Sequence, residues 1–148
     1  VIFINNAIYG MTGGQVAPTT PEESRTMTTP YGSGEPRFDV CKLALAAGAT
    51  HVERWTTMQP LQCKQAMERA LQHKGFSLIE IVSQCPTHYG RYALKTGDPM
   101  KVAEYIQSVT YPQSKGAQMT DEEKEGKLAL GNFLCVDKPI YAGTNMPL

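Results

Sequence analysis

Short apolar runs recur along the chain between glycine- and proline-containing connections, and each run predicts a strand. The first, residues 1–4, consists of β-branched and aromatic residues, which are typical of a strand buried on both faces. We therefore expect it to be parallel, central and fully buried. Residues 49–55 predict a second strand, residues 77–83 another short buried strand and residues 127–136 a late strand.

Helical periodicity predicts helices between these strands. Residues 38–47 predict a short helix that ends at Gly48, and its apolar residues surround most of the circumference, so we expect it to be largely buried. Residues 60–73 predict an amphipathic helix with the stripe Leu61, Cys63, Met67, Ala70 and Leu71. Asp98 and Pro99 begin a third helix, whose expected inner face is Met100, Val102, Ala103 and Ile106.

The order of these elements predicts an α/β fold. Strands that alternate with helices indicate right-handed βαβ units and a parallel sheet. Residues 120–125 add a charge-rich short helix or turn, most simply a solvated face. We divide the chain into a strand with its loop, a long polar connection, a set of βα units and a C-terminal helix, strand and tail: residues 1–15, 16–37, 38–95 and 96–148.

The polar connection of residues 15–36 contains Pro18, Pro21, Pro30 and Pro36, which exclude a helix or a central strand. Loops of this length inside a domain are usually functional or disordered. We expect a lid over a binding site, and an exposed connector is the alternative.

Composition narrows the class of protein. The 148 residues carry 41% hydrophobic residues and a net charge of zero, as one ordinary globular domain or part of one would. No basic stripe suggests nucleic acid, and no apolar run has the length of a membrane span, so we expect a cytoplasmic protein with neither as a partner. Because the chain opens inside a strand without a methionine, we interpret it as a fragment.

Candidate chemistry begins where the first strand ends. Asn5 and Asn6 follow the strand, and Gly10, Gly13 and Gly14 follow them. Ligands bind beyond the carboxyl ends of parallel strands, amide and carbonyl oxygens suit hard cations, and glycines let the backbone approach a phosphate. The pattern predicts a site for a metal–phosphate group, and a tight turn without a ligand is the alternative.

Two stretches of this sequence resemble the thiamine-diphosphate-binding subunit of 2-oxoacid:ferredoxin oxidoreductases. The first is Asn5-Asn6-Ala7-Ile8-Tyr9-Gly10-Met11-Thr12-Gly13-Gly14-Gln15, continued by Ala17-Pro18-Thr19-Thr20-Pro21. The second is Gly75-Phe76-Ser77-Leu78-Ile79-Glu80-Ile81-Val82-Ser83-Gln84-Cys85-Pro86-Thr87. The resemblance fades after about Arg91. It implies a partial doubly wound parallel sheet of the thiamine-diphosphate-binding fold, without its N-terminal strands.

The resemblance also implies ligands. Mg²⁺ would be held by the Asn6 side chain and the Ile8 backbone carbonyl. The loop of residues 9–15 would line the diphosphate and the reacting carbon, with these cofactor-binding residues beside Asn6 and Ile8: Tyr9, Gly10, Met11, Thr12 and Gly13. The family's Gly-Asp-Gly element and its Cys-x-x-Cys pair do not occur in these 148 residues.

The four cysteines, Cys41, Cys63, Cys85 and Cys135, contain no CxxC pair, and their spacing favours reduced structural thiols. Cys41 and Cys63 fall on the apolar faces of the predicted helices, Cys135 falls at the end of the apolar run of residues 128–136, and we expect all three in the core. Cys85 lies at a strand end before a proline. The resemblance implies that this thiolate is one ligand of a [4Fe–4S] cluster whose other ligands lie outside this chain.

The function implied by the resemblance is oxidative decarboxylation of a 2-oxoacid with coenzyme A, in which electrons pass through [4Fe–4S] to ferredoxin. The acid that activates the cofactor would come from another subunit or domain, so the partners include an α subunit, further small subunits and ferredoxin. No catalytic residue is assigned within this chain.

Several points stay open from sequence. A non-redox thiamine enzyme of the acetolactate synthase type would share the Mg²⁺ ligands, and the chain could be catalytically inert as it stands. Gly13 offers no cation to a second carboxylate, which mildly favours an apolar 2-oxoacid over 2-oxoglutarate. His88 could transfer protons or be solvated, and Arg91 could meet a carboxylate or lie on the surface.

Overall fold

The structure, a computed structural model, describes residues 1–139. It contains one five-stranded sheet with the strand order β1-β3-β2-β5-β4. The strands are β1 (Ile2–Asn5), β2 (His51–Thr56), β3 (Ser77–Val82), β4 (Thr110–Pro112) and β5 (Leu128–Cys135). The helices are α1 (Val40–Ala46), α2 (Pro60–Gln72), α3 (Pro99–Ser108), α4 (Gln113–Gly116) and α5 (Asp121–Lys124), with a single π-helical turn, η1 (Pro86–Gly90).

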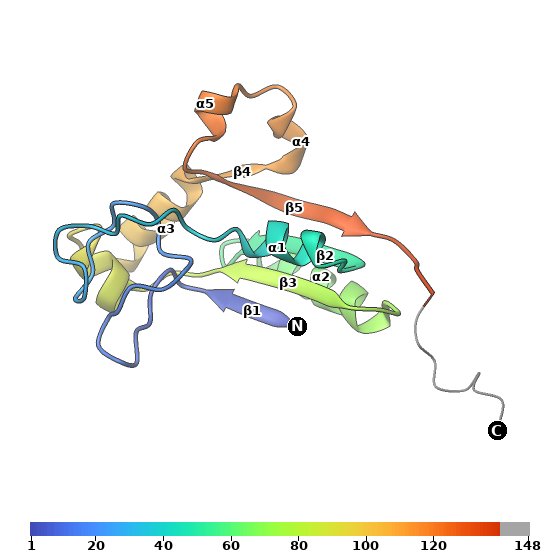
Figure 1. Cartoon of the computed structure of the whole chain (residues 1–148), viewed down its shortest axis with the longest axis horizontal. Coiled ribbons are helices and arrows are strands. Elements are labelled where there is room, and N and C mark those ends of the chain that lie inside the picture. Colours follow the sequence, from blue (N-terminus) through green and yellow to red (C-terminus); the bar gives the residue numbers. More distant parts are fainter. Residues whose placement is uncertain (140–148) are drawn as a thin grey trace.

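The three strands that precede residue 85 are parallel. β3 lies between β1 and β2 and pairs with each in parallel, and α2 connects β2 to β3 as expected for a βαβ unit. β5 then pairs antiparallel with β2, and the short β4 runs parallel to β5. The sheet is therefore mixed but mostly parallel, which confirms the α/β class. In Figure 1, β1 and β3 point toward the same end of the molecule, where the loop after β1 gathers with α3.

The two faces of the sheet are covered by different helices. On one face, α1 packs through Cys41 against Val52 and Leu78, with Phe3 beside them. The other face packs against α2, and its cluster comprises Cys63, Ala66, Ile79 and Ile81. Successive residues of β3 alternate between these clusters, as the pleat of a strand requires.

The position of β1 corrects one prediction. β1 is an edge strand within residues 1–139, and Ile2 and Ile4 are 53% and 57% exposed. The apolar run predicts burial because β-branched residues are typical of central strands. Within the described chain, however, only β3 pairs with β1, and Ile4 lines an open groove beside α2. The parallel orientation is confirmed, and the expectation of a central, fully buried strand is wrong.

The helices are less buried than their patterns predict. In α1 only Cys41 is buried, and Leu43 is exposed because a short helix covers the sheet with one side. Leu61 and Leu71, at the two ends of α2, are exposed, whereas Cys63 lies in the core. In α3 the expected inner face is confirmed for Val102, Ala103 and Ile106 but not for Met100, which lies in the exposed first turn.

The C-terminal part holds two elements that the sequence pattern did not predict, β4 and α4. α5 is the expected charge-rich helix, and it begins with a capping box in which Thr120 and Glu123 exchange hydrogen bonds. Most of the predicted tail lies outside the described residues. Among the helices of the described chain, none combines the length and apolarity that a bilayer crossing requires.

Candidate metal and cofactor site

The chain turns sharply where β1 ends, in a segment that we call the asparagine turn (residues 5–8). The Ala7 amide donates to Asn5 Oδ1 over 3.0 Å, and the Ile8 amide donates to Asn6 Oδ1 over 3.2 Å, so each asparagine side chain caps the backbone two residues on. Ala7 adopts the left-handed conformation at φ 62°, and its carbonyl accepts a 2.7 Å bond from the Thr20 hydroxyl. The turn is held by hydrogen bonds from both sides.

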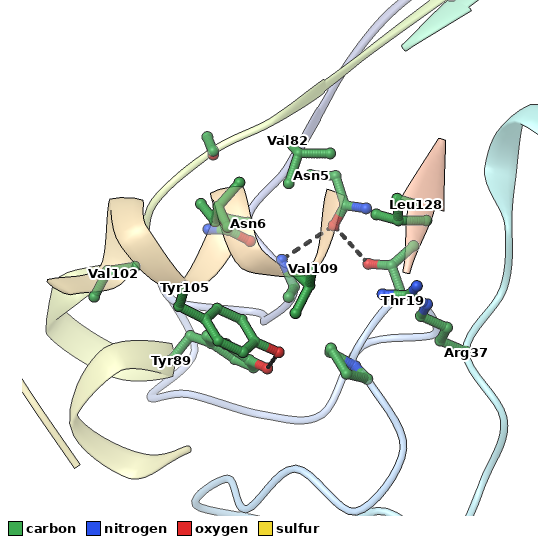
Figure 2. Close-up of a pocket in the computed structure, with 14 residues that line it drawn as sticks. Asn5, Asn6, Thr19, Arg37, Val82, Tyr89, Val102, Tyr105, Val109 and Leu128 are labelled. Atoms are coloured by element: carbon green, nitrogen blue, oxygen red, sulfur yellow. Dashed lines mark hydrogen bonds between the residues drawn. The ribbon is translucent and has the colours of Figure 1, made fainter. Parts of the chain in front are cut away.

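Asn5 uses its side chain entirely for structure. Besides the Ala7 amide, Oδ1 accepts a 2.9 Å bond from the Thr19 hydroxyl, and Nδ2 donates to Glu80 Oε1 over 2.7 Å. Figure 2 shows the two bonds to Oδ1 at the edge of a cavity of about 40 Å³. That cavity is of the size that water fills, so it excludes a cofactor. Asn5 is buried and has no oxygen to offer a metal.

Asn6 and Ile8 are different. The Asn6 side chain is half-buried and makes only its bond to the Ile8 amide, and no hydrogen bond within residues 1–139 ends on the Ile8 carbonyl. An amide oxygen and a backbone carbonyl two residues apart are oxygen ligands of the kind that Mg²⁺ takes. The residues present therefore fit an Mg²⁺ ion that is completed by phosphate oxygens and other ligands.

A cleft of about 280 Å³ opens beside these two residues. It brings the asparagine turn together with the loop after β1 and the start of α1, and its lining includes Asn6, Ile8, Tyr9, Pro18, Thr19 and Phe38. A cleft of this volume, unlike the small cavity behind Asn5, has room for a diphosphate group. Of the predicted cofactor residues, the structure places Asn6, Ile8 and Tyr9 on its wall.

The remaining predicted cofactor residues form a closed loop. Tyr9 and Gln15 bridge its base, and within the described chain the amides of Gly10, Met11 and Thr12 donate to no group. Free backbone amides in a glycine-containing loop form the kind of concavity that binds anions. Gly13, at φ +104°, lies at the exposed tip with open space around it.

His88, whose role the sequence left open, packs under this loop. A Cβ added at Gly14 would lie 2.9 Å from His88 Nδ1, and one added at Gly10 would lie 3.5 Å from His88 Cδ2. The ring stacks on Tyr92, and its buried Nδ1 has no hydrogen-bond partner among the described residues. His88 supports the loop from below, whereas Arg91 is exposed on the surface.

Cys85 lies beside the same turn. It is buried in one cluster with Ile8 and Tyr89, and its Sγ lies 3.7 Å from the Thr87 hydroxyl oxygen. Cys85, the predicted iron ligand, and Ile8, a predicted Mg²⁺ ligand, therefore lie in the same group of buried side chains. A single thiol can occupy one ligand position of an iron–sulfur cluster but cannot hold the cluster without further ligands.

The other cysteines lie elsewhere. All four are free thiols, as expected. Cys41 and Cys63 lie in the cores of opposite faces of the sheet, which confirms both predictions. Cys135 ends β5 and is exposed, so its predicted burial is wrong. β4 pairs only with the first three residues of β5, so within the described chain Cys135 has a paired strand on one side alone.

Sequence reasoning missed a buried series of charged and polar side chains that ends at the asparagine turn. We call it the polar network: Asp39, Arg54, Glu80 and Asn5. Arg54 Nε donates to Glu80 Oε2 over 2.6 Å, and Arg54 Nη2 donates to Asp39, which also caps α1. A partial signal was available, because Glu80 interrupts an otherwise apolar, buried run in β3.

Electrostatics keeps this network charged. Burial by itself would raise the pKa of the Asp39 carboxyl, but the Arg54 guanidinium lowers it below the ordinary value. Burial also opposes the charge of Arg54, yet Glu80 raises the Arg54 pKa above its ordinary value. Asp39, Cys41 and Glu80 are close enough to resemble a metal site, but the Arg54 guanidinium already binds both carboxylates. Burial raises the pKa of the Cys41 thiol, which donates to Glu80.

Three comparisons with known proteins bear on this site. The family model described as the thiamine pyrophosphate enzyme, C-terminal TPP binding domain, matches residues 1–81. The 2-oxoglutarate synthase subunit KorB of Methanocaldococcus jannaschii is 48% identical over 141 residues, which cover 95% of this chain and 52% of that protein. The ketoisovalerate oxidoreductase subunit VorA of Methanothermobacter marburgensis is 39% identical over 101 residues, 60% of this chain and 21% of that protein.

A solved structure is similar as well. The 2-oxoglutarate:ferredoxin oxidoreductase from Magnetococcus marinus, with 2-oxoglutarate, coenzyme A and succinyl-CoA bound, superposes with a TM-score of 0.74 at 27% identity. The match covers 93% of this chain and 47% of that chain. This chain therefore spans about half the length of the KorB relative and of the solved chain.

Proposed function

Because this chain belongs to the thiamine pyrophosphate enzymes, through their C-terminal cofactor-binding domain, we propose that it serves in a 2-oxoacid:ferredoxin oxidoreductase. The reaction would be the oxidative decarboxylation of 2-oxoglutarate with coenzyme A, and electrons would leave through a [4Fe–4S] cluster to ferredoxin. The observation that carries the proposal is the pair of oxygens on Asn6 and Ile8 at the wall of a cleft: within residues 1–139, Asn6 Oδ1 accepts only the Ile8 amide and the Ile8 carbonyl accepts no hydrogen bond.

The residues of this chain would mainly bind and orient. Asn6 Oδ1 and the Ile8 carbonyl would hold Mg²⁺, and the amides of the loop would face the diphosphate. The bound cofactor supplies an electron sink for loss of carbon dioxide. Cys85 would contribute one cluster thiolate. His88 would keep the loop in place from below.

The described residues offer two Mg²⁺ ligands and one cluster thiolate, which is fewer than either site requires, so the proposed enzyme needs further parts. The remaining cluster thiolates and Mg²⁺ ligands would come from outside this chain, together with an α subunit, further small subunits and ferredoxin. The loop of residues 16–37, whose Thr19 and Thr20 bind the asparagine turn, would cover the cofactor as a lid. The protein would act in the cytoplasm.

The relatives' names support 2-oxoglutarate as the substrate. The KorB relative, named for 2-oxoglutarate, shows higher identity over more of this chain than the VorA relative, named for ketoisovalerate. This outweighs the earlier inference from Gly13, because the cation for a second carboxylate can come from another part of the enzyme. Turnover with 2-oxoglutarate should exceed turnover with 2-oxoisovalerate, and the reverse preference would contradict the substrate assignment.

The metal assignment is tested with Asn6→Ala. Mg²⁺ is titrated calorimetrically, in the presence of thiamine diphosphate, into the protein that carries this chain. Removal of the side-chain ligand that Asn6 contributes should weaken Mg²⁺ binding by at least about tenfold. Asn132→Ala, an exposed asparagine in β5, is the matched control and should leave affinity unchanged. Equal affinities of the two variants, or no binding by the unmodified protein, would contradict the proposal.

The redox assignment is tested separately with Cys85→Ser. If Cys85 is a cluster ligand, the variant enzyme should lose most of its bound iron and its visible absorbance. The matched control is Cys63→Ser, a buried thiol on the α2 face. A cluster that survives in the Cys85 variant would contradict the ligand assignment, and an unmodified enzyme that holds no cluster would favour the other candidate function, a non-redox enzyme of the acetolactate synthase type.

A further inference from the structure

The polar network connects the start of α1 to the asparagine turn across three strands. Asp39 caps α1, Arg54 lies on β2, Glu80 on β3 and Asn5 at the end of β1. Each member is hydrogen-bonded to the next, and the last bond, from Asn5 Nδ2 to Glu80 Oε1, measures 2.7 Å. The network is thus a continuous line of contacts that ends one residue before Asn6.

Glu80 has both carboxylate oxygens engaged, and by different groups. Oε2 accepts bonds from Arg54 and from the Cys41 thiol, which leaves Oε1 for Asn5. Arg54 is 1% exposed and holds the carboxylate in place. A fixed carboxylate in turn fixes the amide plane of Asn5, because Nδ2 must face Glu80.

Fixing the plane of Asn5 places its oxygen. With Nδ2 on Glu80, Oδ1 faces the Ala7 amide and the Thr19 hydroxyl, so one side chain orients both the turn and the loop above it. Ala7 is held in a left-handed conformation that an L residue seldom adopts. Residues that orient metal ligands without touching the metal typically change its affinity by 10–100-fold.

Resting on the proposed function, we propose that Glu80 is a positioning residue for the Mg²⁺ site. It acts through Asn5, whose hydrogen bonds set the backbone from which the Asn6 side chain and the Ile8 carbonyl project. A buried ion pair contributes little net stability and is often replaceable by apolar residues. A role in positioning the asparagine turn would explain why the charged pair of Glu80 and Arg54 is buried between β3 and β2.

Glu53 provides a matched control on the opposite face. It is 0% exposed, compared with 1% for Glu80, and it too pairs with an arginine, Arg69, over 2.8 Å. It accepts further bonds from Trp55 and lies close to His51, but it makes no contact with the asparagine turn. Glu53→Gln and Glu80→Gln are the same chemical change at equal burial.

The experiment measures Mg²⁺ affinity in the presence of thiamine diphosphate, using the protein that carries this chain, with circular dichroism to verify folding. Glu80→Gln should raise the Mg²⁺ Kd about tenfold. Glu53→Gln should change it less than about twofold, although both variants lose stability. Equal Kd values for the two glutamine variants would overturn the inference.

A second variant guards against a folding defect at Glu80. Asn5→Ala removes the same contact but leaves the ion pair of Glu80 with Arg54 intact, and it should weaken Mg²⁺ binding to a similar extent. If the two residues act as one unit, the double variant should bind no more weakly than the worse single variant. Additive losses would overturn the inference. Absence of binding in the unmodified protein would instead contradict the proposed function.

Discussion

Two buried glutamates on opposite faces of the sheet show how similar chemistry can serve different ends. Glu53, on the α2 face, binds the guanidinium of Arg69 on α2 with both oxygens, so it joins a helix to the sheet. Glu80, on the α1 face, binds Arg54 from the neighbouring strand and Asn5 from the strand end. The first contact fixes an element of the fold, and the second fixes the turn that carries the candidate metal ligands.

The arginine partners differ as well. Arg69 is 42% exposed, so its charge is partly solvated, and Glu53 keeps two other polar neighbours. Arg54 is buried, and it compensates both Glu80 and Asp39. Among the described residues, Arg54 is the single cation that pairs with Glu80 and Asp39, whereas Glu53 is stabilised by Arg69 together with His51 and Trp55.

The largest expected effect follows from removing that cation. Arg54→Met leaves two carboxylates on the α1 face without a charged partner, and we expect a loss of about 3–5 kcal/mol in the free energy of unfolding. The measurement is urea unfolding followed by circular dichroism. Arg69→Met, the matched change on the α2 face, should cost about 1–2 kcal/mol. Equal losses would show that the two faces do not differ.

A fall in pH should destabilise the protein partly through Glu53 on the α2 face. Burial alone would raise the pKa of Glu53, but hydrogen bonds from Arg69, His51 and Trp55 lower it from 4.5 to about 2. A depressed carboxyl pKa stabilises the fold above pH 4.5, and that stability is lost as the pH falls toward 2.

Between pH 7 and pH 3 this loss amounts to about 2 kcal/mol for Glu53. Urea unfolding of the unmodified protein and of Glu53→Gln at both pH values measures it, because the variant lacks the titrating group. The variant should show the smaller decrease in unfolding free energy. The same decrease in both proteins would mean that Glu53 is not the group that titrates.

A smaller effect concerns the loop beyond the turn. Gly14 at φ +92° lies against His88, whereas Gly13 at φ +104° has open space around it. Gly14→Ala and Gly13→Ala share the backbone strain, about 1–2 kcal/mol each. Thermal unfolding should show an additional loss of about 1 kcal/mol for Gly14→Ala alone, which His88→Ala in the same chain should restore. If the two single variants unfold alike, His88 does not support the loop.

Much of the fold could be predicted because local patterns determine it. The strand at 77–83 and the helix that starts at Pro99 were found from periodicity and capping. The exposure of Ile2 and Ile4 at the sheet edge could not be predicted, because their apolar pattern is the same whether or not another element covers them. β4 has three residues and is too short to show a recognisable hydrophobic periodicity.

The site divides in the same way. The resemblance to a known family implies Asn6 and Ile8 as ligands, and the structure adds that, within the described chain, Asn6 Oδ1 accepts only the Ile8 amide and the Ile8 carbonyl accepts no hydrogen bond. Glu80 alone signals a buried charge, but its partners could not be predicted, because residues 5, 54 and 80 meet only through strand register. His88 gave too weak a signal, since its contact with Gly14 crosses more than seventy positions of sequence.

The most direct test of the account is the position of the metal in a crystal of the protein with thiamine diphosphate and Mn²⁺ in place of Mg²⁺. The anomalous signal of Mn²⁺ identifies the ion and its ligands. We expect the ion to be coordinated by Asn6 Oδ1 and by the Ile8 carbonyl, with Asn5 still hydrogen-bonded to Glu80. An ion bound by Asn5, or one with no ligand from the asparagine turn, would contradict it.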